Sequence, residues 1–270
     1  MDSQKEKAIR NIVSSSIQSF AIGLETRHIS EANDPDGVIN KKRNNCFMSV
    51  LGDEFIFYSA CVRSFDSSFG KVLENLGNSI AKYSYDKTIN EIEAFIMPEQ
   101  EQRISNLLNN YKNHVTKPLT SHYDSFNTII PDNVESYKHK HSCDNLFYSQ
   151  KDKTYYLIEL KAGADLDNKK AESEKNALLT EYFMLKNIIN KDEKIIVKIA
   201  TAYNKFGEGK PWHQANVETF FAKEELLIGK DYWDFVCDDS DGFDIIFDEY
   251  KNSAKYIEEV LINVKNAYNL

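Results

Sequence analysis

The clearest strand signal in the chain is CDNLFYSQKDKTYYLIELKA, residues 143–162. Two runs rich in aromatic and aliphatic residues, NLFYSQ and TYYLIELK, flank a short polar segment, and this pattern is typical of a β-hairpin. A two-residue turn at Lys151-Asp152 would pair residues whose numbers add up to 303, so that Asp144 lies directly opposite Glu159. Directly opposed Cβ atoms are about 5 Å apart. The sequence therefore predicts that two carboxylates meet at one end of the hairpin.

Two carboxylates at that distance repel each other, and each raises the pKa of the other. They are suited to hold a hard divalent cation such as Mg²⁺, which prefers oxygen ligands. Lys161 lies two residues after Glu159, so side-chain alternation places both on one face of the strand. A lysine there can orient a water molecule and stabilise developing negative charge. A surface hairpin with an ordinary charged face remains the alternative, because Glu-x-Lys alone is a common pattern and the pairing depends on the register.

The rest of the chain predicts an α/β protein with a central mixed β-sheet flanked by helices. Helical periodicity is present at residues 3–20, 67–83, 99–113 and 167–190, and Ser67 or Ser68 is expected to cap the second of these helices. Residues 48–58 form a short apolar element of undecided type, and residues 114–142 are polar and rich in turn-forming residues. The run KIIVKIATAY at 194–203 is apolar enough for a central strand.

No stretch rich in Gly, Ser or Pro divides the chain, so a single domain is expected. Within it we distinguish an N-terminal helix and loop extension at 1–63, a core at 64–221 that carries the hairpin, and an acidic, mostly helical C-terminal segment at 222–270.

The composition excludes several classes of protein. With 15 Tyr, 16 Phe and 2 Trp, the chain is too rich in aromatic residues to be globally disordered. No window approaches 18 consecutive apolar residues, so no transmembrane helix is expected, and the polar N-terminus does not resemble a signal peptide. The four widely spaced cysteines form no CxxC pair, and we expect reduced thiols in a cytoplasmic protein. Motifs of nucleotide-phosphate loops and of the hydrolase nucleophile elbow are absent from the sequence.

The hairpin resembles the core of the PD-(D/E)xK nuclease fold, in which an acidic residue on one strand and (D/E)xK on the next bind Mg²⁺. A closer resemblance, to the TdeIII-like family of type II restriction endonucleases, runs from about residue 64 to 250. Its segments occur here in the same order, as SSFGKVLENLG, the hairpin, KIATAYNKFGEGKPW and AKEELLIGKDYWDFVCDDSDGF. One departure is that Cys143 precedes Asp144, where the motif has proline.

The resemblance implies a restriction-endonuclease-like fold and Mg²⁺-dependent hydrolysis of DNA phosphodiester bonds. Asp144 and Glu159 would bind one or two Mg²⁺, with the carbonyl of Leu160 as a further ligand. Lys161 would position or activate the attacking water. Glu74, on the upstream helix, matches a position that often supplies another glutamate near the metal. Pro131-Asp132 also fits the name of the motif, so Asp132 is the alternate acid, although it lies 27 residues before Glu159 and Asp144, at 15 residues, fits a hairpin better.

The implied substrate is double-stranded DNA with a short palindromic site, and the resemblance hints at a GC-rich one. A palindrome is most simply read by a two-fold symmetric homodimer, for which the C-terminal helices are a plausible interface, and a cognate DNA methyltransferase is expected in the same system. Candidate DNA-binding residues follow the catalytic strand: Lys169, Lys170, Lys175, Asn204, Lys205, Lys210, Trp212, His213 and Gln214. The alternatives are a PD-(D/E)xK nuclease of repair or recombination without strict specificity, and a non-enzymatic α/β DNA-binding or interaction protein.

The net charge of -9 argues at first against DNA as a partner. Its distribution weakens that argument, because residues 223–270 carry a net charge of -7 and the remaining chain carries only -2. A nearly neutral body can present a basic cleft, since binding follows the local field. The charge therefore excludes a protein that coats DNA indiscriminately and leaves a magnesium-dependent nuclease open.

Overall fold

The computed structural model describes residues 1–126, 138–163 and 165–270, and in it the chain forms two compact units. The sheet unit is Gly77–Phe243, and the helical unit combines Met1–Leu76 with Asp244–Leu270. These boundaries differ from the segment limits expected after residues 63 and 221. The expectation of one domain stays a prediction.

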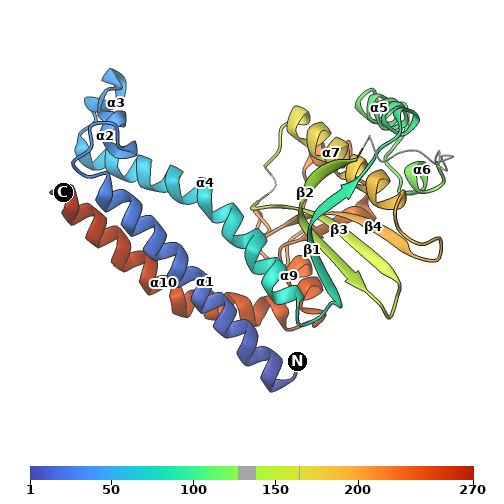
Figure 1. The fold of residues 1–270 in the computed structure, drawn as a ribbon. Helices are drawn as coiled ribbons and strands as arrows, with labels where there is room; N and C mark the ends of the chain where they lie inside the picture. The colour runs from blue at the N-terminus through green and yellow to red at the C-terminus, as the bar shows by residue number, and fades with distance from the viewer. Residues whose placement is uncertain (127–137, 164) are drawn as a thin grey trace. The chain divides into compact units, whose positions relative to one another are not determined.

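The sheet unit is built on a mixed β-sheet, which confirms the predicted α/β class (Figure 1). Among the described residues the sheet has five strands in the order β1-β2-β3-β4-β5. The neighbours β1/β2 and β2/β3 are antiparallel, whereas β3/β4 and β4/β5 are parallel. The strands are β1 (Lys87–Ala94), β2 (His139–Ser149), β3 (Thr154–Lys161), β4 (Lys194–Thr201) and β5 (Leu226–Ile228).

The hairpin of β2 and β3 has the predicted register but not the predicted turn. The pair Asn145↔Ile158 and the pair Ser149↔Thr154 both add up to 303. The turn is a four-residue loop, residues 150–153, and not the two-residue turn expected at Lys151-Asp152. Lys153 takes a positive φ of 49° to close it. The register is kept although the loop is longer, because a slip by one residue would exchange the side chains on the two faces of both strands.

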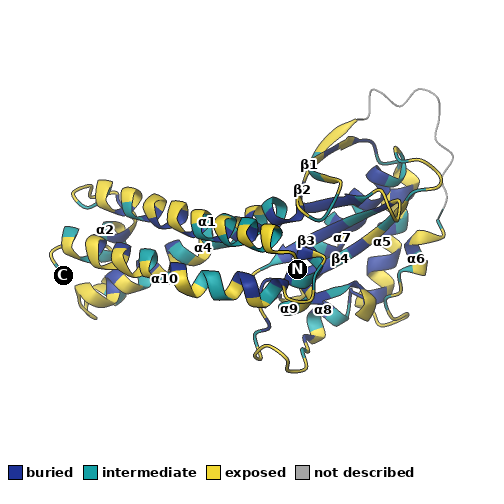
Figure 2. Cartoon of the chain, turned by 90° about the horizontal axis from the view of Figure 1, so that it is seen from below, coloured by how far each residue is buried: buried dark blue, intermediate teal, exposed yellow. Residues whose placement is uncertain are grey.

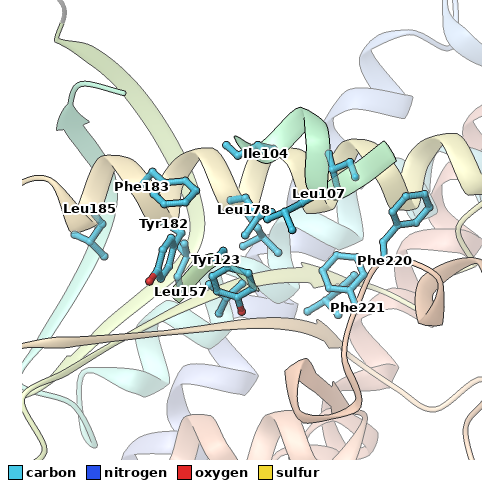
Figure 3. Packing of buried hydrophobic residues seen from close by; sticks show 14 of the residues in the cluster. Ile104, Leu107, Tyr123, Leu157, Leu178, Tyr182, Phe183, Leu185, Phe220 and Phe221 are labelled. Atoms are coloured by element: carbon cyan, nitrogen blue, oxygen red, sulfur yellow. The ribbon is translucent and has the colours of Figure 1, made fainter. Parts of the chain in front are cut away.

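Helices α5 (Pro98–Lys112) and α7 (Asn168–Lys186) supply the apolar side chains that pack with one face of the sheet. Figure 3 shows this core, in which Leu178 and Phe183 of α7 lie near Leu157 of β3 and Ile104 of α5. Helix α7 has the length of a typical globular helix and ends four residues before the expected limit of 190. Burial of this face stabilises the sheet on which the charged end of the hairpin is carried.

The segment between β4 and residue 243 is less helical than expected. It contains the short helix α8 (Ala215–Glu218), the 3-10 turn η2 (Lys223–Glu225) and then strand β5. The run VETFFAKEELL is therefore mostly not helical. Leu227 pairs with Ala200 and is buried, so its tertiary environment overrides the helical propensity of the run. Helix α9 (Lys230–Cys237) follows directly.

The helical unit contains α1 (Ser3–Ser30), the short helices α2 (Val38–Arg43) and α3 (Cys46–Ser49), most of α4 (Asp53–Ala81) and most of α10 (Gly242–Ala267). Figure 2 shows buried and exposed residues alternating along α1 and α10, as amphipathic helices require. Helix α4 contains residues 53–58 of the undecided apolar element and residues 67–81 of the predicted helix 67–83. Ser67 and Ser68 therefore do not cap it, and both hydroxyls donate to the carbonyl of Ser64 within the helix.

The described helices include none that is long and apolar enough to cross a membrane. The four cysteines are free: Cys46 is exposed, and Cys61, Cys143 and Cys237 are buried.

Candidate active site

Asp144 lies where the ladder between β1 and β2 is interrupted. Ile89 pairs with Leu146 and Glu91 pairs with Ser142, so three residues of β2 stand opposite the single residue 90 of β1. Such bulges re-aim side chains and are common beside active sites. The Asp144 carboxylate here accepts a hydrogen bond from the backbone N–H of Leu160, with 3.2 Å between Oδ2 and N.

The backbone of Asp144 is held as well. Asn78 Nδ2, near the end of α4, donates to the Asp144 carbonyl oxygen at 2.8 Å. In a regular strand pair, a main-chain carbonyl would accept the hydrogen bond from the N–H of Leu160, and here the Asp144 carboxylate accepts it instead. The Asp144 carbonyl is left without a strand partner by the bulge, and Asn78 donates a hydrogen bond to it. Asp144 is fixed through both its side chain and its main chain.

Glu159 and Lys161 project from the same face of β3, as alternation predicts, and Lys161 Nζ donates to Glu159 Oε1. A third group joins them from α7, because Glu174 Oε1 lies 3.1 Å from Lys161 Nζ. The Glu159 side chain is 12% exposed and that of Lys161 26% exposed. The lysine is therefore held between two carboxylates in a partly buried position.

Burial and the nearby charge of Asp144 raise the pKa of Glu159 to about 9. For Lys161, burial acts to lower the pKa, but the two carboxylates Glu159 and Glu174 outweigh it and raise the pKa above its ordinary value. Near neutral pH the lysine is therefore charged, and Glu159 tends to keep a proton unless another positive charge approaches. Two crowded carboxylates with this property are a favourable donor set for a hard divalent cation.

A second acidic side chain of α7, Glu181, lies beside this group and is almost completely buried. His141 Nδ1 is 2.7 Å from Glu181 Oε1, and burial raises the pKa of Glu181 to about 7 against the opposing effect of His141. His141 and its neighbour His139 belong to strand β2, whereas the sequence had placed them in a polar, turn-rich stretch. The same carboxylate hydrogen-bonds Cys143, whose thiol pKa is raised by burial.

Sequence reasoning missed both glutamates of α7. A signal was present, because positions 174, 178 and 181 follow the i, i+4, i+7 spacing of one helix face and Leu178 is fully buried. Acidic residues on an otherwise apolar stripe are expected to have a partner. In the described part of the chain, however, no group of three or more His, Cys, Asp or Glu side chains is arranged to hold a metal ion.

The candidate DNA-binding residues differ in how far their side chains are exposed. Lys169, Lys170, Lys210 and His213 are exposed, and His213 pairs with Glu218. Lys205 is partly buried and pairs with Asp165, and Trp212 is partly buried beside the core of the sheet unit. Asn204 and Gln214 are buried, and their amides hold loops through the carbonyls of Lys210 and Leu166.

The expected DNA contact of Lys175 is wrong, because its side chain is completely buried and cannot reach DNA in this structure. Its Nζ donates to Glu225 Oε1 at 2.5 Å, and the Tyr123 hydroxyl donates to the same oxygen at 2.6 Å. Burial lowers the pKa of the lysine, and the ion pair with Glu225 opposes that effect. Lys175 is thus an internal tie between α7 and the turn before β5.

The remaining two predicted site residues stay predictions. Glu74 belongs to the helical unit, where Lys71 Nζ lies 2.5 Å from its carboxylate. Asp132 falls outside the described residues. Asp144, by contrast, is brought to the same strand end as Glu159 and Lys161.

Comparison with known proteins gives one result. A family model described as "Type II restriction endonuclease, HinfI" matches residues 5–254. No curated protein and no solved structure matches the chain.

Proposed function

The chain belongs to the HinfI family of type II restriction endonucleases, and we propose that Asp144, Glu159 and Lys161 are the residues with which it cleaves DNA. Membership makes the protein a type II site-specific deoxyribonuclease that acts on double-stranded DNA. The class expected from the sequence is confirmed, and the family that matches is HinfI. The match favours this function over a nuclease without sequence specificity and over a non-enzymatic binding protein.

The observation that carries the residue assignment is the meeting of two carboxylates and a lysine at one strand end. Asp144 and Glu159 would hold Mg²⁺, and the raised pKa of Glu159 supports this, because such a pair is stabilised by a neighbouring positive charge. The Leu160 carbonyl would be the further ligand. Its N–H faces Asp144, and in a strand the C=O of a residue points to the same edge as its N–H. When bound, Mg²⁺ would stabilise the negative charge that develops on the phosphate and on the leaving oxygen.

Lys161 acts as a fixed cation. Without metal, the carboxylates of Glu159 and Glu174 raise the pKa of Lys161, which favours a protonated Nζ that donates hydrogen bonds. From its position beside Glu159, Nζ orients the attacking water and the phosphate oxygen on which charge develops. Glu174 is the positioning residue of this arrangement, since it holds the ammonium group from the side of α7.

The finer features of the activity follow the same proposal. The enzyme reads a short palindromic site as a homodimer, because a two-fold symmetric protein presents the same side chains to both half-sites. The exposed Lys169, Lys170 and Lys210 contact DNA. A cognate DNA methyltransferase protects the host sequence but is not a stable partner.

The test is digestion of a long defined DNA with Mg²⁺ and with EDTA. The wild-type protein should give discrete bands only with Mg²⁺. Lys161→Ala should cut about 100- to 1,000-fold more slowly, which is the usual effect of removing one group that stabilises developing charge, while still binding DNA. Lys153→Ala, an exposed lysine at the opposite end of the hairpin, is the control and should cut normally. Full cleavage by Lys161→Ala would refute the assignment, and a smear of fragments would refute site specificity.

A further inference from the structure

The loop that follows β4, residues 202–210, is fixed by its own polar side chains. Asn204 Nδ2 donates to the Lys210 carbonyl at 2.7 Å, and Asn204 Oδ1 accepts from the backbone N–H of Phe206 at 3.0 Å. Gly207 and Gly209 take positive φ angles of 101° and 76°, which glycine adopts without strain. The loop therefore has a defined shape.

Glu208 ties this loop to the start of α9. One of its carboxylate oxygens accepts from the N–H of Asn204 at 2.6 Å, and the other accepts from the N–H of Lys230 at 3.1 Å. A carboxylate at the first turn of a helix is favourably placed for the helix dipole. Gly229 directly precedes α9, and a Cβ added there would lie 2.4 Å from the Glu208 carboxylate. The loop and the start of the helix therefore approach so closely that only glycine fits at this position.

Two aromatic side chains of this rigid loop face solvent. Tyr203 is 51% exposed and Phe206 is 45% exposed. The Tyr203 ring lies against Gly163, where an added Cβ would be 2.5 Å from the hydroxyl oxygen. Lys205 Nζ lies 5.3 Å from the centre of the Phe206 ring and forms an ion pair with Asp165. The Tyr203 ring is thus positioned by the segment that leaves β3, and Lys205, the neighbour of Phe206, is paired with the same segment.

The loop that carries these rings leaves β4 beside the end of β3 that bears the proposed catalytic lysine. Gly163 is two residues after Lys161, and the N–H of Ala202 donates to the Lys161 carbonyl at 3.0 Å. Tyr203 is the next residue after Ala202. A phosphate that reaches Lys161 would therefore bring the neighbouring nucleotides to the ends of β3 and β4, where the two rings are exposed.

We propose that Tyr203 and Phe206 stack against nucleobases of the strand that is cut, next to the scissile phosphate. The inference rests on the proposed function of the Lys161 site. Exposed aromatic rings on a preorganised loop lose little conformational freedom on binding. Such a ring can stack on a base of the duplex where a base step is partly unstacked, as proteins that insert apolar side chains between base steps do.

The experiment measures binding and cleavage with the full-length protein and a short duplex that carries a site mapped by digestion. Binding is measured with Ca²⁺ in place of Mg²⁺, and cleavage is measured in single turnover with Mg²⁺. Tyr203→Ala and Phe206→Ala should each weaken binding about tenfold, in line with the loss of one stacked base. Tyr203→Phe keeps the ring and should bind like wild type. The slope of log Kd against log salt should stay unchanged for all three variants, because no phosphate contact is removed.

The matched control is Tyr83→Ala. Tyr83 is 54% exposed in the same unit and precedes β1, whose first residue pairs with Tyr148 near the hairpin loop, at the other end of the sheet. Thermal melting of each variant separates a folding defect from a binding defect. If Tyr203→Ala and Phe206→Ala bind DNA like Tyr83→Ala, the inference is wrong. It is also wrong if Tyr203→Phe binds as weakly as Tyr203→Ala, since the hydroxyl would then be the contact. Failure of wild type to cleave, or cleavage by Lys161→Ala, would instead overturn the proposed function.

Discussion

Replacing Glu159 with glutamine should make the protein more stable in the absence of metal while it abolishes cleavage. Glu159 has an ordinary pKa of 4.5 and a folded-state pKa of about 9, with burial and Asp144 as the main causes. The unfolded chain therefore ionises this group at neutral pH, whereas the folded protein resists its ionisation. A glutamine has nearly the same shape and can still accept a hydrogen bond from Lys161, but it does not titrate.

The magnitude follows from linkage. A pH of 7 is 2.5 units above the unfolded-state pKa of 4.5 and lies below the folded-state pKa of about 9. Ionisation of Glu159 therefore stabilises the unfolded chain, and it destabilises folded wild type by about 3 kcal/mol at ~1.36 kcal/mol per unit. Because the folded pKa is raised, the stability is complete below pH 4.5 and is lost as the pH rises toward 9. A glutamine that reproduces only some of the hydrogen bonds of the protonated carboxyl gains less, so about 3 kcal/mol is an upper bound.

The assay is urea unfolding in EDTA at pH 5, 7 and 9. The free energy of unfolding of wild type should fall from pH 5 to pH 9. That of Glu159→Gln should fall less, and at pH 7 it should be larger than that of wild type. Glu93→Gln, an exposed glutamate on strand β1, is the control and should follow wild type. Adding Mg²⁺ should stabilise wild type and leave Glu159→Gln unchanged. The reasoning is refuted if Glu159→Gln is less stable than wild type in EDTA at every pH, or if it cleaves DNA at the wild-type rate.

Three further substitutions test the packing and the ion pairs around the site. Lys175→Met leaves Glu225 buried without its cation and should lower the free energy of unfolding by about 3–5 kcal/mol, measured by chemical denaturation; the double replacement with Glu225→Gln should recover part of the loss. Gly77→Ala would place a Cβ 2.2 Å from the Tyr232 hydroxyl oxygen and should cost about 1–3 kcal/mol, which Tyr232→Phe in the same chain should reduce if the clash is the cause. Glu174→Gln removes one of the two carboxylates that hold the site lysine and should slow single-turnover cleavage about tenfold with unchanged DNA affinity, since a hydrogen bond to a charged group contributes ~1.5–3 kcal/mol.

The hairpin was predictable because its information is local. Leu157 and its paired residue Leu146 are buried on one face of the hairpin, and Ile158 and its paired residue Asn145 are buried on the other, so a slip by one residue would exchange the side chains of the two faces. That constraint fixed the register although the turn has four residues and not two. The position of Asp144 was predicted for the same reason. The bulge that directs its carboxylate toward Leu160 depends on the pairing with β1, and no local sequence pattern predicts that pairing.

The elements that were missed depend on tertiary contacts. Strand β5 has three residues, too few for a periodic signal, and it exists because β4 offers it a parallel edge. Helix α4 runs through Ser67 and Ser68, whose hydroxyls bond to the carbonyl of Ser64 and so do not end the helix, although serine is a common capping residue. Local propensity was outweighed in both cases by packing along the whole element.

Neighbours on α7 mark the limit of what the sequence can assign. Glu174 and Lys175 are adjacent in a run of charged residues, and successive residues on a helix point about 100° apart. One side chain reaches the site lysine Lys161, while the other is buried against Glu225 and two aromatic rings. A charge pattern read as a solvated or DNA-facing surface cannot distinguish these outcomes, because they are decided by partners 13 and 50 positions away in the chain. The assignment of Glu174 to the site therefore required the packing of α7 on the sheet, and the same packing removes Lys175 from any surface that DNA could reach.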